Sequence, residues 1–257
     1  MRKLFVAAIA AAVAVAGFSV FAVAGTGQQQ TSWEFTFSKK GPNKPTGSNS
    51  DLSPAKVNDQ GTPDTADDRF VAPSKSVIKF PAGSNVNDDA KAKCKESPSD
   101  VQARRAACPG RTKIGSGVAN AVTGQSPTSS GTELISNIEA FNVKNGILFV
   151  VDPCTEGTGP GRSCQPIPSA RVVLVGKWKK VNTRPTLTVV TPPALLTGGV
   201  IITRFQLKTN KINSRAKGSY VNTPDVCPRS REWTSTATET YQDGTKQTIR
   251  DTQVCNR

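Results

Sequence analysis

Apolar and polar residues alternate along most of the chain after residue 70, a pattern typical of strands that bury one face. Val, Ile, Thr and Phe are frequent in the alternating segments, whereas Gly, Pro, Asn and Asp stand between them, as expected for short strands joined by turns. The pattern predicts nine strands, at residues 75–80, 115–123, 133–143, 147–152, 170–179, 186–191, 199–209, 232–241 and 245–254.

The polar segment before these strands contains one further strand candidate. Residues 32–37 alternate aromatic and polar positions, which places Trp33, Phe35 and Phe37 on one face. We expect this strand to dock on the β-domain. We expect residues 39–53, which are rich in Lys, Asn, Ser and Pro, to form a loop or to be mobile.

Turn residues and a capping pattern add local detail. Asn145-Gly146 and Asp243-Gly244 each stand between two predicted strands, and both dipeptides accept the positive φ angles of a two-residue type I′ turn. Residues 98–107 are the one segment with a helical pattern, and Ser99 is its predicted N-cap.

The six cysteines form three couples that are close in sequence. We expect disulfides between neighbours, although spacing alone leaves other connectivities open. In the chain-entropy picture each closed loop stabilises the fold by about 3 kcal/mol. A zinc site is disfavoured because the chain lacks both a Cys-x2-Cys spacing and any histidine. The predicted pairs are Cys94/Cys108, Cys154/Cys164 and Cys227/Cys255.

The beginning of the chain has the pattern of a secretory signal peptide. Arg2 and Lys3 precede an apolar stretch at residues 4–24, and cleavage is predicted between Ala24 and Gly25. An uncleaved anchor is the alternative, because this stretch is just long enough to cross a bilayer. With cleavage no transmembrane domain is expected. We then expect a protein that is secreted into the extracellular medium or held at the cell surface, where disulfides persist.

The expected organisation is a signal peptide at residues 1–24, a polar segment with one docked strand at residues 25–68, and one domain at residues 69–257. The predicted fold class of that domain is all-β. It is expected to be a single antiparallel sandwich-like domain of Greek-key or immunoglobulin-like character, with one short helix and three local disulfides.

The chain is basic, with 33 Lys and Arg against 19 Asp and Glu, a formal charge of +14. The basic residues are spread along the chain, so no segment has the density of a specific nucleic-acid-binding arm. We expect attraction to anionic cell-envelope polymers or lipid head groups. The three tryptophans lie in alternating strands and are expected in the core, but Trp178 stands among lysines and is a candidate surface-binding residue. That candidate surface consists of Lys177, Trp178, Lys179 and Lys180.

The absence of histidine excludes His-based triads and dyads and disfavours most zinc hydrolases and haem proteins. Two carboxylates suffice for a glycoside hydrolase, so that class stays open as an alternative. In alternating strands such side chains are usually solvated, and we expect no enzymatic activity. The carboxylates considered are Glu133, Glu139, Glu232 and Glu239.

An acidic loop at residues 58–68 resembles part of a thrombospondin type 3 calcium repeat. Clustered carboxylates can supply the oxygen ligands that calcium needs, which makes calcium the one cofactor to consider. The loop departs from the repeat at Pro54, Ala55 and Lys56, and a solvated acidic loop is the alternative. The candidate calcium ligands are Asp59, Asp64, Asp67 and Asp68.

Several segments resemble uncharacterised secreted proteins of high-GC actinobacteria: residues 77–83, 108–117, 173–176 and 233–255. The similarity covers most of residues 77–255, and it implies an exported, β-rich protein without implying an activity. We therefore expect a non-enzymatic binding or structural protein of the cell surface or extracellular medium. An extracellular polysaccharide hydrolase and a calcium-dependent adhesion module are the alternatives.

Overall fold

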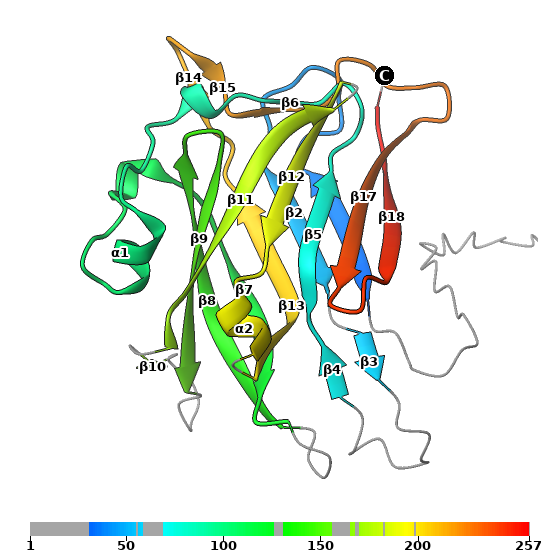
Figure 1. Cartoon of the computed structure of the whole chain (residues 1–257). Coiled ribbons are helices and arrows are strands. Elements are labelled where there is room, and N and C mark those ends of the chain that lie inside the picture. The colour runs from blue at the N-terminus through cyan, green and yellow to red at the C-terminus, as the bar shows by residue number, and fades with distance from the viewer. Residues whose placement is uncertain are drawn as a thin grey trace, which may run out of the picture.

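The structure, a computed structural model, describes residues 31–54, 56–58, 69–125, 131–155, 165–167, 170–181, 183–197 and 199–256. Within these residues the chain is almost entirely antiparallel β-structure. Figure 1 shows its long strands standing side by side around a common interior. The antiparallel all-β class predicted from the alternation is therefore confirmed.

One twelve-stranded sheet forms the body of the described chain. Its strands are β1 (Ser32–Phe37), β2 (Ser48–Ser53), β5 (Pro73–Lys79), β7 (Lys113–Thr123), β8 (Thr132–Val143), β9 (Gly146–Thr155), β10 (Gln165–Pro166), β11 (Val172–Val181), β12 (Arg184–Val190), β13 (Val200–Thr209), β17 (Glu232–Tyr241) and β18 (Lys246–Val254). In space they follow the order β1-β2-β13-β7-β8-β9-β11-β12-β5-β17-β18, with β10 beside β9.

The short strand pairs and helix α2 (Pro193–Thr197) lie at the two ends of this sheet, whereas helix α1 (Pro98–Gln102) lies at its flank, against β9 and β11 (Figure 1). The short strand pairs are β3 (Lys56–Asn58) with β4 (Arg69–Val71), β6 (Asn85–Val86) with β16 (Val221–Asn222), and β14 (Asn213–Ser214) with β15 (Gly218–Ser219). Single 3-10 turns occupy Asp88–Ala90 and Gly110–Thr112.

The sheet curls until its first and last strands, β1 and β18, lie against each other. Side chains of β18 hydrogen-bond to the backbone of β1 along this seam. Asp251 accepts a hydrogen bond from the Phe35 N–H at 2.7 Å. The Gln253 amide accepts from the Phe37 N–H at 2.7 Å and donates to the Phe37 carbonyl at 2.9 Å. Side-chain amide and carboxylate groups thus replace a backbone ladder where the sheet closes.

The sheet is consequently barrel-like, and the expected sandwich of Greek-key or immunoglobulin-like character is not clearly formed. Alternation buries one face of every strand in a sandwich and in a barrel alike, so it does not distinguish the two architectures. The distinguishing feature is the seam between β1 and β18, which depends on the polar side chains of Asp251 and Gln253.

Both predicted hairpins exist, but each turn differs from the expected two-residue type I′ loop. In the first, Val143 pairs with Gly146, so the loop residues are Lys144 and Asn145, and Asn145 takes the positive φ of 55°. In the second, Thr240 pairs with Lys246, which gives a longer loop. There the Asp243 carboxylate accepts from the Thr245 N–H at 3.0 Å, an Asx-type contact that competes with the tight turn.

The predicted helix at residues 98–107 is shorter than expected. Its N-cap is Ser97, not Ser99: the Ser97 hydroxyl accepts from the Asp100 N–H at 3.1 Å, and Pro98 follows at the first helical position. The helix ends after Gln102, and Arg104 then adopts a positive φ of 57°, which is incompatible with continued helix.

Two of the three predicted disulfides are present, Cys94–Cys108 and Cys227–Cys255. Cys164 lies outside the described residues, so its pair with Cys154 stays a prediction. The predicted signal peptide, with its cleavage site at Ala24 and Gly25, also lies outside them. Among the described residues, no helix combines the length and apolar character needed to cross a membrane.

The polar segment contributes more strand than expected. Residues 48–53, predicted as part of a loop, form β2 between β1 and β13. Leu52 is its one large apolar side chain and is buried. Pairing on both sides, rather than intrinsic strand propensity, therefore accounts for β2.

Candidate binding site in the barrel interior

Aromatic side chains fill much of the barrel interior, beginning with those of β1. Trp33, Phe35 and Phe37 are all buried, as their alternation predicts. The ring of Phe35 contacts that of Phe80 edge-on, with centroids 4.8 Å apart, and Phe80 in turn contacts Trp178 at 5.3 Å. These edge-to-face contacts hold the rings in defined positions around the space between them.

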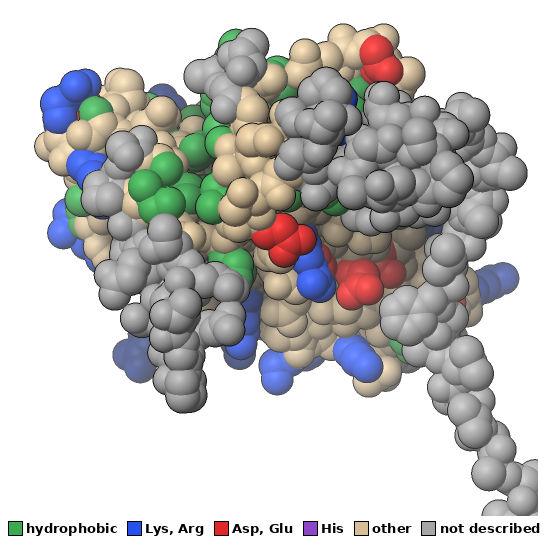
Figure 2. All heavy atoms as spheres, turned by 90° about the horizontal axis from the view of Figure 1, so that it is seen from below, with side chains coloured by type: hydrophobic (Ala, Val, Ile, Leu, Met, Phe, Trp, Pro, Cys, Tyr) green, Lys and Arg blue, Asp and Glu red, His purple; other side chains and the backbone are tan. Residues whose placement is uncertain are grey.

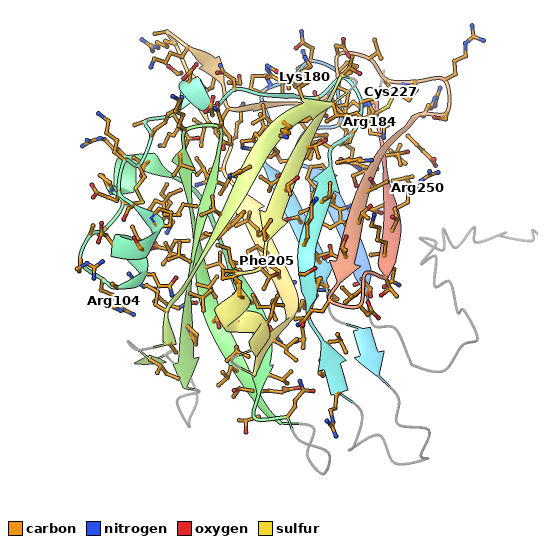
Figure 3. The ribbon with its side chains drawn as sticks, viewed as in Figure 1. Arg104, Lys180, Arg184, Phe205, Cys227 and Arg250 are labelled. Carbon is orange, nitrogen blue, oxygen red and sulfur yellow. A yellow bond between two sulfur atoms is a disulfide. The ribbon has the colours of Figure 1, made fainter. Side chains whose placement is uncertain are left out.

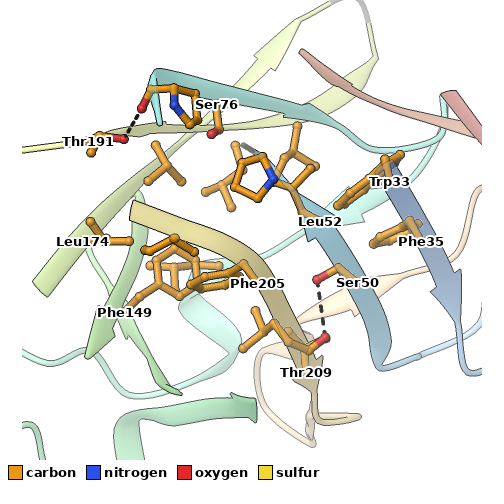
Figure 4. A pocket seen from close by; sticks show the side chains of 18 of the residues that line it. Trp33, Phe35, Ser50, Leu52, Ser76, Phe149, Leu174, Thr191, Phe205 and Thr209 are labelled. Carbon is orange, nitrogen blue, oxygen red and sulfur yellow. Dashed lines mark hydrogen bonds between the residues drawn. The ribbon is translucent and has the colours of Figure 1, made fainter. Parts of the chain in front are cut away.

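A cavity of about 110 Å³ remains in this interior. Its walls are almost wholly apolar, and side chains from many strands line it, including Trp33, Leu52, Phe149, Leu174 and Phe205 (Figure 4). A space of this size exceeds what a single water molecule needs, and apolar cavities of roughly this volume accept small hydrocarbon molecules. The cavity is therefore the best-formed candidate for a ligand site in the described chain.

The cavity lining reaches both ends of the barrel. At one end α2 contributes Leu195, beside Ile202 of β13 and Thr191. At the other end lie Trp178, close to the turn between β11 and β12, and Tyr220, which directly precedes β16. Figure 2 views the end near α2 and shows hydrophobic side chains reaching the surface there.

Most polar groups at the cavity wall have partners in the protein. The hydroxyls of Ser48 and Thr209 lie 2.7 Å apart, and the Thr191 hydroxyl donates to the Pro73 carbonyl at 2.7 Å. The Ser76 hydroxyl donates to a carboxylate oxygen of Glu239 at 2.6 Å. These hydroxyls are hydrogen-bonded within the fold, so they need no ligand to satisfy them.

Glu239 is the one acidic side chain that is fully buried among the described residues, with 0% of its surface exposed. It lies on the inward face of β17 together with Trp233, Ala237 and Tyr241. One carboxyl oxygen accepts from Ser76, and the other is buried without a hydrogen-bond partner in the described chain. Burial raises the pKa of Glu239 to about 7, and the Ser76 hydrogen bond opposes only part of this rise.

The four carboxylates considered for glycoside hydrolysis lie in different surroundings. Glu133 and Glu232 are exposed, and Glu139 binds the ammonium of Lys113 at 2.6 Å. Glu232 and Glu239 share β17, but seven positions separate them. They therefore point to opposite faces and lie about 23 Å apart along the strand, far beyond the roughly 5–9.5 Å that such catalysis requires.

The residues Lys177, Trp178, Lys179 and Lys180 do not form one surface, because Trp178 points into the barrel. The three lysines are exposed, but Trp178 is half-buried and lines the interior cavity, so it is not a surface stacking residue. Alternation along β11 explains this, because Trp178 faces opposite to Lys177 and Lys179. Figure 3 shows Arg104, Lys180 and Arg250 at separate places on the outside, with Phe205 within the barrel.

The candidate calcium ligands Asp59, Asp64, Asp67 and Asp68 lie outside the described residues. Within the described chain, no group of three or more His, Cys, Asp or Glu side chains is placed to hold a metal ion. The calcium hypothesis consequently stays a prediction from sequence.

The comparisons with known proteins add no assignment. No protein-family model, no curated protein and no solved structure matches this chain. The resemblance to secreted actinobacterial proteins therefore stays an expectation from sequence.

Sequence reasoning missed the cavity, the place of Tyr220 in its wall, and the burial of Glu239. A signal for Glu239 was present, since it shares its parity in the strand with Trp233 and Tyr241. Tyr220 lies outside every predicted strand, and no local pattern indicates that it reaches the interior.

Proposed function

We propose that this protein is exported and acts by binding, and that its ligand is a small, mostly apolar molecule held inside the barrel. The observation that carries the proposal is the cavity of about 110 Å³, whose wall is built from aromatic and aliphatic side chains. Burial of apolar surface contributes about 25 cal/mol for each Å² removed from water, which favours such a ligand over a polar one.

Two further observations support export and a non-catalytic role. The disulfides Cys94–Cys108 and Cys227–Cys255 are typical of proteins that fold outside the cytoplasm. The chain has no histidine, and Glu232 and Glu239 point to opposite faces of β17. Binding is therefore favoured over hydrolysis.

The proposal is tested with methylenecyclopentane, a compact hydrocarbon, titrated into the full chain and followed by the NMR shifts of interior methyl groups. Saturable shifts confined to the cavity wall are expected. The variant Ile202→Trp would fill the cavity and should abolish these shifts. Ile249→Trp is the matched control, because Ile249 is also half-buried against the core but does not line the cavity. Absence of any saturable shift in the parent protein would refute the proposal.

A second candidate function rests on charge. The formal charge of +14 and the exposed lysines of β11 favour adhesion to anionic envelope polymers or lipid head groups. Such adhesion weakens as salt screens the charges, so retention on an anionic polymer that does not change with ionic strength would refute it.

A further inference from the structure

The aromatic residues with polar atoms divide into those that have hydrogen-bond partners and those that do not. The chain has three tryptophans. The Trp33 indole N–H donates to the Ser235 hydroxyl at 2.9 Å, and the Trp233 indole N–H donates to the Val226 carbonyl at 2.9 Å. The Trp178 indole nitrogen is buried and has no hydrogen-bond partner in the described chain.

The two tyrosines divide in the same way. The Tyr241 hydroxyl donates to the Pro54 carbonyl at 2.8 Å. Only 1% of Tyr220 is exposed, and its buried hydroxyl has no hydrogen-bond partner in the described chain. Buried polar atoms without partners are uncommon in folded proteins, and each one calls for an explanation.

Both unsatisfied atoms belong to side chains that line the same cavity. They are near each other, and a weak hydrogen bond from the Trp178 indole N–H to the Tyr220 hydroxyl opposes part of the rise in the pKa of Tyr220 that burial causes. The geometry of this contact falls short of a regular hydrogen bond, so it does not satisfy either group fully. Each ring is held by other contacts. Trp178 packs edge-on against Phe80, and the Tyr220 backbone binds those of Asn87 and Ile212.

We infer that Trp178 and Tyr220 form the polar end of the cavity, and that both donate hydrogen bonds to one oxygen atom of the bound molecule. The inference rests on the proposed function and names the chemical class of its ligand. An indole N–H can only donate, so the partner must be an acceptor, and a carbonyl oxygen has lone pairs for both donors.

The lining also limits the charge of the ligand. No Lys or Arg side chain lines the cavity in the described part of the chain, so a carboxylate or phosphate would be buried without a counter-ion. The ligand class is therefore a small, uncharged and mostly apolar compound with a carbonyl oxygen at one end, such as a ketone or an aldehyde.

The test compares cyclopentanone with methylenecyclopentane, which differ only in the replacement of the carbonyl oxygen by a CH₂ group. Each is titrated into the full chain and followed by NMR, with the three indole N–H signals as reporters. Cyclopentanone should bind roughly three- to tenfold more tightly for each hydrogen bond that it accepts. It should shift the Trp178 indole signal while leaving that of Trp233, which does not line the cavity, in place.

Variants identify the two donors. Trp178→Phe and Tyr220→Phe should each reduce the preference for cyclopentanone by that same factor and leave methylenecyclopentane binding nearly unchanged. Tyr241→Phe is the matched control, because its hydroxyl already has a partner and its side chain does not line the cavity. It should leave the preference unchanged.

The outcomes separate the inference from the proposed function. If methylenecyclopentane does not bind, the proposed function fails and the inference that rests on it fails too. If methylenecyclopentane binds and cyclopentanone binds no better, the cavity function stands and the inference is wrong, because the two donors are then satisfied by water or by each other. An unchanged preference in both Phe variants would overturn it as well.

Discussion

Glu239 gives the sharpest prediction about stability, because it is a fully buried carboxyl group in the barrel wall. Its pKa rises from the ordinary value of 4.5 to about 7 in the folded protein, chiefly through burial. Ser76 is its hydrogen-bond partner, and among the described residues no charged side chain contributes to the shift. The folded state therefore holds a proton on Glu239 at pH values where the unfolded state has lost it.

The sign and size of the effect follow from this difference. Below a pH of about 4.5 both states are protonated and Glu239 costs nothing through ionisation. As the pH rises toward about 7, the unfolded state binds fewer protons than the folded state, so the free energy of unfolding falls. Above about 7 the full cost is present. A shift of about 2.5 units corresponds to about 3 kcal/mol at roughly 1.4 kcal/mol for each unit.

The substitution Glu239→Gln removes the titration and keeps the shape of the side chain. The free energy of unfolding of this variant, relative to the parent protein, should therefore increase by about 3 kcal/mol between a pH of about 4 and about 8. Urea unfolding followed by tryptophan fluorescence measures it. Glu232→Gln is the control on the same strand, where the side chain is exposed, and it should track the parent at all pH values. A constant difference between Glu239→Gln and the parent across this range would refute the reasoning.

Three further predictions concern the seam, the sheet and the surface. Gln253→Leu removes both hydrogen bonds to Phe37 and should lower the free energy of unfolding by about 2–4 kcal/mol in urea titrations; a loss below about 1 kcal/mol would mean that packing alone closes the barrel. A Cβ on Gly117 would collide with the Gln206 carbonyl of β13, so Gly117→Ala should lower the melting temperature, whereas Gly110→Ala, with open space around it, should leave it nearly unchanged. Replacing Lys177, Lys179 and Lys180 by Gln should elute the protein from an anionic polymer at lower salt, and an unchanged elution would exclude this surface from adhesion.

Prediction from sequence succeeded where the alternation of side chains was itself the cause of the structure. Residues 32–37 and 232–241 coincide with β1 and β17, because a strand with one apolar face is stable only with that face buried. β2 was missed for the opposite reason. Its sequence Ser-Asn-Ser-Asp-Leu-Ser is polar and has no apolar alternation. It forms a strand because it pairs with β1 on one side and with β13, which is distant in sequence, on the other.

The closure of the barrel between β1 and β18 could not be predicted from local sequence patterns either. Asp251 and Gln253 read as ordinary polar positions of an edge strand, and nothing near them in sequence indicates that they bind the backbone of β1. The predicted loop positions of the two hairpins were also wrong, by a few residues at most. Asn145 does adopt the positive φ that its dipeptide suggests, but the pairing of Val143 with Gly146 moves the loop by one residue.

Gln253 and the pair formed by Trp178 and Tyr220 are buried polar side chains in two different situations. Gln253 has protein partners at both its amide oxygen and its amide nitrogen, as expected of a group that holds strands together. Trp178 and Tyr220 have no such partners, and both line the apolar cavity inside the barrel. Buried donors without a protein partner are expected mainly at functional sites. The acceptor for the Trp178 and Tyr220 donors is therefore expected to be a molecule bound in the cavity.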